Sequence, residues 1–95
     1  MNSKNSNSIK VTDFIANALV HHGIRHIFML TGGGAMHLND SLGKHPALQV
    51  IFNHHEQASA MAAESYARLT NQMAVVNVTT GPGGINAFNG VFGAW

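Results

Sequence analysis

Three short apolar runs, each followed by a polar or glycine-rich turn and then by a helical pattern, constrain the fold of this chain most. The runs are HIFML, LQVIF and MAVVNV, and the turns that follow them are TGGG, NHHE and TTGPGG. Apolar runs of this length that alternate with helices are typical of buried parallel strands joined by right-handed crossovers. We therefore predict an α/β fold in which a parallel β-sheet is flanked by helices, with the functional edge at the strand C-termini.

The helical segments are bounded by recognisable start and stop signals. VTDFIANALVHHG predicts a first helix that Thr12 caps and that Gly23 ends in the left-handed conformation. Further helices are predicted in AMHLNDSLG, HHEQASAMAAESYARL and INAFNGVFGAW. The core-facing residues expected in the first helix are Phe14, Ile15, Ala18 and Leu19.

The domain organisation expected from the sequence is a short head followed by part of one domain. Residues 1–8 are polar and are predicted to be disordered, whereas residues 9–95 carry the regular alternation. Three strands would hardly complete a sheet, and the last helical pattern runs to Trp95. The sequence therefore predicts an incomplete N-terminal domain, truncated at its C-terminal end. Only 9% of the residues are charged, which indicates that other surfaces cover part of its exterior.

Charge and composition argue against several classes of partner. The formal net charge is +1 and no basic run occurs, so neither nucleic acid nor an anionic membrane is an expected partner. No apolar run approaches the roughly 18 residues of a membrane-spanning helix. The chain has no cysteine, and the start MNSKNSNSIK lacks the layout of a signal peptide, so we expect a cytoplasmic protein.

The seven histidines do not predict a metal site. Only His22 and His26 have the i, i+4 spacing of helical ligands, and Gly23 interrupts the helix between them. No cysteine or pair of nearby carboxylates supplements them. We therefore expect none of the residues of this chain to ligate a metal.

The two glycine loops invite a nucleotide-binding interpretation, which their spacing does not support. The third glycine of a dinucleotide fingerprint is replaced by His37 in the first loop and by Asn86 in the second. Neither loop continues into the Gly-Lys-Ser/Thr of a P-loop. Two alternatives remain: tight turns that bring a helix close to its strand, or an anion site at a helix N-terminus. A non-catalytic α/β module that binds a phosphorylated small molecule is thus one candidate function.

Glu56 is the notable acid, because it stands at the head of a long alanine-rich helix. Asn53 is a favourable N-cap residue three positions earlier, so Glu56 could fold back on the Asn53 amide in a capping box. It could equally be a carboxylate presented at the edge of the sheet. The residues alone do not separate these two interpretations. A stripe formed by Ala58, Met61, Ala62, Ser65 and Leu69 is expected to let another helix pack closely on this one.

The combination of HEQASAMAAESYAR with TTGPGGINAFNGV separates the two interpretations of Glu56, because it resembles a known family. From Val11 to Trp95 the chain is similar to the pyrimidine-binding (PYR) domain of thiamine-diphosphate enzymes, in particular the acetolactate synthase-like family. GGGAMHLNDSL resembles the loop and short helix of the same domain, although Gly32 replaces a proline. The matching residues are His55, Glu56, Gln57, Ala62, Ala63, Tyr66, Ala67, Arg68, Thr79, Gly81, Pro82, Gly83, Asn86 and Ala87.

The resemblance implies a catalytic role for Glu56. In this family the carboxylate hydrogen-bonds a ring nitrogen of the cofactor's aminopyrimidine and favours its imino tautomer, which deprotonates the thiazolium carbon. The activated cofactor then attacks a 2-oxo acid such as pyruvate and supports decarboxylation and carboligation. The resemblance also implies that Gly33, Gly34, Thr79, Pro82 and Asn86, together with Glu56, bind the cofactor.

The resemblance further implies parts that these 95 residues lack. The family binds the diphosphate and Mg²⁺ through a separate C-terminal domain, whose G-D-G motif does not occur here, and it forms homodimers or tetramers with the cofactor between subunits. The chain alone is therefore expected to be inactive, poorly soluble and weak in cofactor binding. A fragment that only pairs with a homologous subunit is the remaining alternative.

Overall fold

The computed structural model describes residues 9–95, so the predicted disordered head, residues 1–8, lies outside the described residues. The described part alternates helices and short strands, as predicted. Its elements are α1 (Val11–His21), β1 (His26–Met29), the 3₁₀ turn η2 (Gly33–Ala35), α2 (Met36–Lys44), β2 (Gln49–Phe52), α3 (Glu56–Thr70), β3 (Val75–Asn77) and α4 (Pro82–Ala94).

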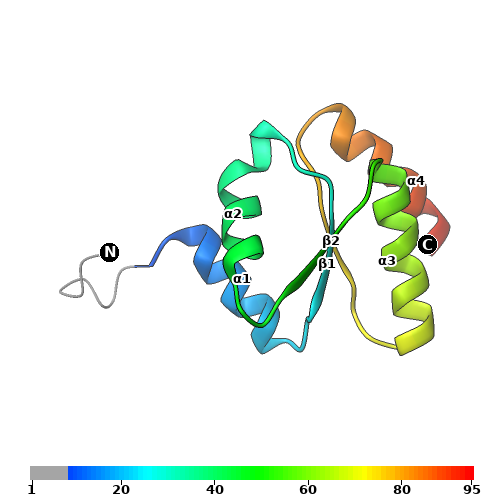
Figure 1. Cartoon of the computed structure of the whole chain (residues 1–95). Helices are drawn as coiled ribbons and strands as arrows, with labels where there is room; N and C mark the ends of the chain where they lie inside the picture. Colours follow the sequence, from blue (N-terminus) through cyan, green and yellow to red (C-terminus); the bar gives the residue numbers. More distant parts are fainter. Residues whose placement is uncertain (1–8) are drawn as a thin grey trace.

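The strands of residues 9–95 form one parallel sheet in the order β2-β1-β3. Ile27 of the central strand lies opposite Val50 on one side and Val75 on the other. Helices α1 and α2 cover one face of the sheet, and α3 and α4 cover the other (Figure 1). The predicted α/β class with a parallel sheet is therefore confirmed. Because all strands run the same way, their carboxyl ends meet at one edge, at the top of Figure 1.

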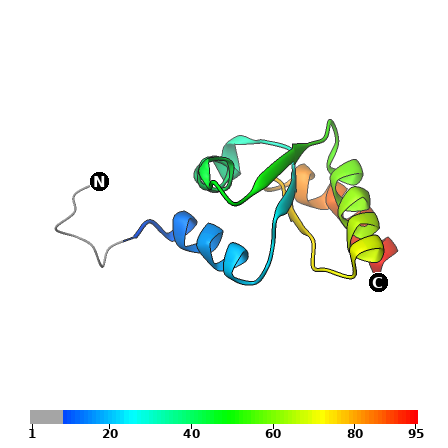
Figure 2. The same ribbon diagram turned by 60° about the horizontal axis from the view of Figure 1, so that its bottom comes forward.

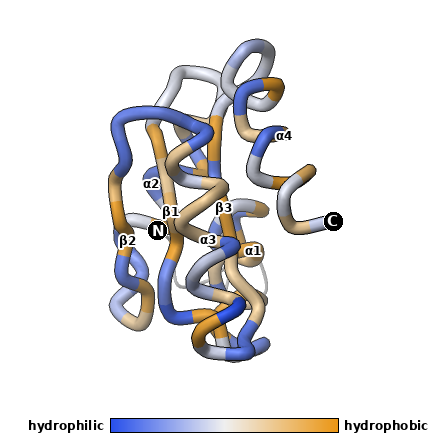
Figure 3. The backbone as a smooth tube through the Cα atoms, turned by 90° about the vertical axis from the view of Figure 1, so that its right-hand side faces the viewer, coloured by the Kyte–Doolittle hydropathy of each residue, from blue (hydrophilic) through white to orange (hydrophobic). Residues whose placement is uncertain are grey.

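The core lies between the sheet and the α1–α2 layer. Its buried side chains come from α1, β1, α2 and the segments that precede β1 and β2, and β1 is the most deeply buried strand. Figure 3 shows the strands as hydrophobic segments enclosed by helices of mixed character. The core cluster consists of Ala16, Ile24, Ile27, Met29, Leu42 and Leu48.

The rotation of α1 differs from the predicted one. Leu19 packs on the core, as predicted, and Ala16 and Val20 also face it. The predicted Phe14 and Ile15 are 61% and 37% exposed. Apolar residues surround much of this helix, so periodicity alone does not select the buried face. Polar contacts with α2 accompany the observed rotation.

Thr12, the predicted cap, lies inside α1 and serves a different purpose. The helix begins after Lys10, and the Thr12 hydroxyl shares a 2.7 Å hydrogen bond with the Ser41 hydroxyl of α2. Ser41 in turn donates to Oδ1 of Asp13 at 2.6 Å. These contacts fix one face of α1 against α2. At the other end of α1, Gly23 has a φ of 88°, which confirms the predicted left-handed termination.

The close packing of α3 on α4 uses a different stripe from the predicted one. Ala60 and Ala63 are buried, whereas Leu69 of the predicted stripe is 88% exposed. A Cβ atom added at Gly90 of α4 would overlap Ala60, so the two backbones are in direct contact there. A close helix contact through small residues is therefore present, as predicted, but other residues make it. The contact lies on another side of α3, where α4 packs along that helix (Figure 2).

Candidate functional site

The loops that follow the three strands lie side by side at the carboxyl edge of the sheet. Backbone pairing continues past the strands: the Asn53 amide donates to the Met29 carbonyl at 3.0 Å, and the Leu30 amide donates to the Asn77 carbonyl at 3.3 Å. Because β1 is central, its glycine loop lies between the β2–α3 loop and the β3–α4 loop. Parallel topology thus gathers the three unusual turns of the sequence in one place.

Glu56 is the first residue of α3 and does not belong to a capping box. The N-cap is His55, whose extended backbone lets its Nδ1 accept a hydrogen bond from the Gln57 amide at 3.0 Å. Oδ1 of Asn53 accepts a 2.9 Å hydrogen bond from the hydroxyl of Ser59. The helix therefore begins too late for Asn53 and Glu56 to have the required spacing, and the capping interpretation is wrong.

The half-buried carboxylate of Glu56 faces the start of α4. Nδ2 of Asn86 donates to its Oε1 at 3.3 Å. Within residues 9–95 the carboxylate receives one side-chain hydrogen bond, which goes to Oε1. Oε2 therefore remains available to a ligand. Oε2 lies 3.4 Å from the position that a Cβ on Gly83 would occupy. The backbone of α4 therefore passes directly beside the acid.

Thr79 connects the two glycine loops. Its Oγ1 accepts a 3.1 Å hydrogen bond from the Gly34 amide. A Cβ on Gly32 would lie 2.5 Å from Cβ of Thr79, and a Cβ on Gly83 would lie 2.9 Å from its Cγ2. Glycine is therefore needed at these positions because the Thr79 side chain occupies the space. Thr79 thus acts inside the protein as a spacer between the two loops.

Two further predicted site residues border this cluster without contacting Glu56. Gly33 has no atom within 4 Å of an added Cβ, so its side of the loop is open. Pro82 is the exposed first residue of α4, where its fixed φ suits a helix start, and it follows Gly81, whose φ is 67°. The structure thus brings Glu56, Thr79, Asn86 and Gly34 into one connected cluster.

Sequence analysis missed two features of this edge. Gly83 belongs to the recognised pattern, but its role beside Glu56 appears only from the position of α4. Asn77 is a buried polar residue at the end of β3, and its Nδ2 donates to Oδ1 of Asn39 at 2.6 Å. A polar residue within the apolar run VVNV was the signal that could have found it.

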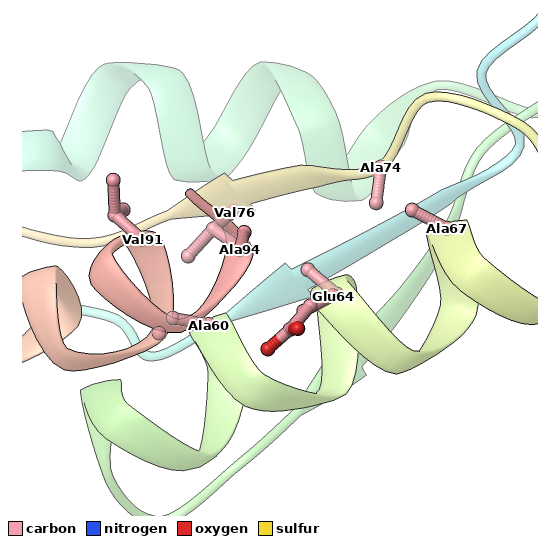
Figure 4. A pocket seen from close by; sticks show the side chains of 9 residues that line it. Ala60, Glu64, Ala67, Ala74, Val76, Val91 and Ala94 are labelled. Carbon is pink, nitrogen blue, oxygen red and sulfur yellow. The ribbon is translucent and has the colours of Figure 1, made fainter.

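An apolar cavity between α3, β3 and α4 is separate from this edge. It has a volume of about 250 Å³ and is lined mainly by alanines, with Val76, Val91 and one acid, Glu64 (Figure 4). Glu64 accepts a 2.7 Å charged hydrogen bond from Arg68. Because its one carboxylate is already paired and the remaining walls are apolar, this cavity offers no second set of reactive groups.

Residues 9–95 contain neither a metal-binding cluster nor a membrane-spanning helix. No group of three or more histidine or acidic side chains is placed to hold a metal ion in this part of the chain. None of its helices is both long and apolar enough to cross a membrane.

The described residues form an α/β unit with the Glu56 carboxylate at the carboxyl edge of its parallel sheet. The family model for the thiamine pyrophosphate enzyme, N-terminal TPP binding domain, matches residues 9–95. The chain belongs to this family.

Curated relatives agree with this assignment. The chain is 37% identical over 83 residues to an acetolactate synthase large subunit of Buchnera aphidicola, covering 87% of the chain and 14% of the relative. It is 36% identical over 95 residues to the acetolactate synthase large subunit of Cyanidium caldarium, covering 96% and 16%. The isozyme 3 large subunit of Escherichia coli is 31% identical over 83 residues, covering 87% and 14%. The chain thus spans only a small part of the length of these relatives.

Proposed function

We propose that the protein carrying this chain is a thiamine-diphosphate-dependent enzyme of the acetolactate synthase type that acts on a 2-oxo acid such as pyruvate. The observation that carries the proposal is the Glu56 carboxylate, held at one oxygen by Asn86 and open at the other, at the carboxyl edge of the sheet. The family match and the acetolactate synthase relatives support the same class. We further propose that the protein works in the cytoplasm as a homodimer or tetramer.

The residues present fit the aminopyrimidine end of this cofactor. The edge offers space for a flat ring at the open side of Gly33 and beside the backbone of Gly83, next to the acid. The ring also needs a polar partner for its nitrogen, which Oε2 of Glu56 can supply.

When bound, thiamine diphosphate supplies an acidic carbon that becomes a nucleophile and then an electron sink for decarboxylation. Glu56 would exchange a proton with the ring nitrogen through Oε2, while Asn86 keeps its Oε1 in place. Thr79 would keep Gly33 and Gly34 at a fixed separation from α4, and Pro82 would fix the turn that leads into it. We assign the diphosphate and Mg²⁺ to residues outside this chain.

The same geometry argues against a phosphate-binding module. The N-terminus of a helix attracts anions, but at α4 the Glu56 carboxylate already lies beside Gly83 in the first turn. A phosphate at that place would lie close to the carboxylate, and the two negative charges would repel each other. A neutral or protonatable ring is therefore the better occupant.

The test is calorimetric titration of the full-length gene product with thiamine diphosphate and Mg²⁺, followed by an assay of pyruvate consumption. The expected result is saturable cofactor binding and cofactor-dependent turnover. Titration with inorganic pyrophosphate is the matched control, since it shares the anionic end and lacks the ring. If pyrophosphate bound as tightly as the whole cofactor and pyruvate were not consumed, the phosphate module would replace our proposal.

A further inference from the structure

The glycine loop after β1 is held from the side of α2 by two asparagines that the proposed function does not yet use. Nδ2 of Asn77 donates to Oδ1 of Asn39 at 2.6 Å, and Nδ2 of Asn39 donates to the Gly32 carbonyl at 3.4 Å. Asn77 is only 6% exposed. A short polar chain therefore runs from the end of β3 through α2 to the glycine loop.

The direction of this chain is fixed by its last member. A backbone carbonyl only accepts hydrogen bonds, so Asn39 must turn its amide NH₂ group toward Gly32. Its own carbonyl then faces Asn77, which must in turn present its NH₂ group. The Gly32 carbonyl also accepts the Ala35 amide at 3.1 Å, so two donors hold it from different sides.

The two ends of the loop are thus tied to the same neighbouring segment. The Gly34 amide is hydrogen-bonded to Thr79, which lies two residues after Asn77. Gly32 is linked to Asn77 itself by hydrogen bonds through Asn39. Gly33, which lies between these two ties, has open space around it. The hydrogen bonds at Gly32 and Gly34 hold the backbone on both sides of Gly33 in place. They leave the space beside Gly33 free for a ligand.

We propose that Asn39 and Asn77 are positioning residues that hold the Gly32–Gly34 loop in its cofactor-binding arrangement. This inference rests on the proposed function for the identity of the ligand. Within residues 9–95 the side-chain hydrogen bonds of these asparagines join each other and Gly32, not Glu56, so we expect their effect on affinity and leave the chemical step to Glu56. Preorganisation of this kind lowers the cost of ordering a loop on binding.

The first variant is Asn39→Asp, which keeps an acceptor for Asn77 but places a carboxylate oxygen against the Gly32 carbonyl. Losing this hydrogen bond should weaken the affinity of the full-length protein for thiamine diphosphate by roughly five- to thirtyfold, whereas kcat at saturation stays within about twofold. In the protein without cofactor, amide hydrogen exchange of the glycine loop should accelerate by a similar factor.

Ser41→Ala is the matched control. Ser41 is on the same helix, is 4% exposed and donates to Asp13, and its side-chain hydrogen bonds within residues 9–95 go to α1 and not to the glycine loop. Its loss should lower the melting temperature and leave both cofactor affinity and loop exchange unchanged. A loss of affinity in Ser41→Ala equal to that in Asn39→Asp would overturn the proposal, because general destabilisation would then explain both.

The double variant Asn39→Leu with Asn77→Leu separates stability from position. Asn77 is buried and Asn39 is half-buried. Replacing both members of such a polar pair by apolar groups of similar shape can be nearly neutral for folding, yet it still removes the donor to Gly32. We expect a folded protein with fast loop exchange and weak cofactor affinity. Wild-type affinity and wild-type exchange in the folded variants would refute the inference. A wild-type protein that did not bind the cofactor would refute the proposed function instead, and the exchange measurement would still decide whether the asparagines hold the loop.

Discussion

Glu56→Gln tests the role of the carboxylate with little disturbance of the fold. The amide has the same length, and its carbonyl can still accept the hydrogen bond from Asn86 that Oε1 receives at 3.3 Å. That orientation places an NH₂ group where Oε2 now lies beside Gly83. A donor then stands where the proposed function needs a proton acceptor, so the variant keeps the contact and removes the chemistry.

The structural cost of Glu56→Gln follows from its place in α3. Glu56 is the first residue of the helix, where a negative charge stabilises by about 0.3–1 kcal/mol. The cap itself is made by His55 and is unaffected. We expect a free energy of unfolding lower by about 1 kcal/mol at most, which corresponds to a fall of about 4–8 °C in the melting temperature of a domain of this size and less in a larger protein.

The catalytic cost should be much larger. Loss of acid-base assistance typically slows a step by about 10²- to 10⁴-fold. The measurement is hydrogen-deuterium exchange at the reacting thiazolium carbon of the cofactor bound to the full-length protein, alongside thermal melting. Glu64→Gln is the matched control, since this acid is on the same helix, pairs with Arg68 and lies outside the site. If Glu56→Gln exchanged that proton at the wild-type rate, the assignment of Glu56 would be lost.

Three further substitutions probe the edge of the sheet and the α3–α4 contact. Pro82→Ala should weaken cofactor affinity more than it changes turnover at saturation, because the proline ring of Pro82 fixes the turn into α4. An unchanged affinity with collapsed turnover would contradict this role. Gly83→Ala should lower cofactor affinity at least tenfold in a titration, since its Cβ would lie 2.9 Å from Thr79 and 3.4 Å from Glu56; wild-type binding would show that this space is not needed. Gly90→Ala should lower the free energy of unfolding by about 1–3 kcal/mol through overpacking against Ala60, whereas a melting temperature at or above that of wild type would show that α4 can shift freely.

Much of the fold could be predicted because it depends on local patterns. The apolar runs contain β1, β2 and β3, because such runs favour strands, and Gly23 follows the end of α1, because glycine tolerates a positive φ. The edge strand β2 is less buried than its apolar run predicts. Glu56 could be singled out because two long motifs agree in order and separation. The predicted cluster of loops also follows from topology, because the carboxyl ends of parallel strands share one edge.

The sequence alone thus determined the order of elements, the class of fold and the acid at the edge of the sheet. Only the tertiary structure decided how α1 is rotated, that His55 caps α3 in place of Asn53, and which residues surround the acid. The contact between Asn86 and Glu56 spans 30 residues and that between Asn77 and Asn39 spans 38. Helical and strand periodicities describe neighbours a few residues apart. Side chains this distant meet only when the crossovers have placed their helices on particular faces of the sheet, so the partners of a polar group are a property of the packed fold.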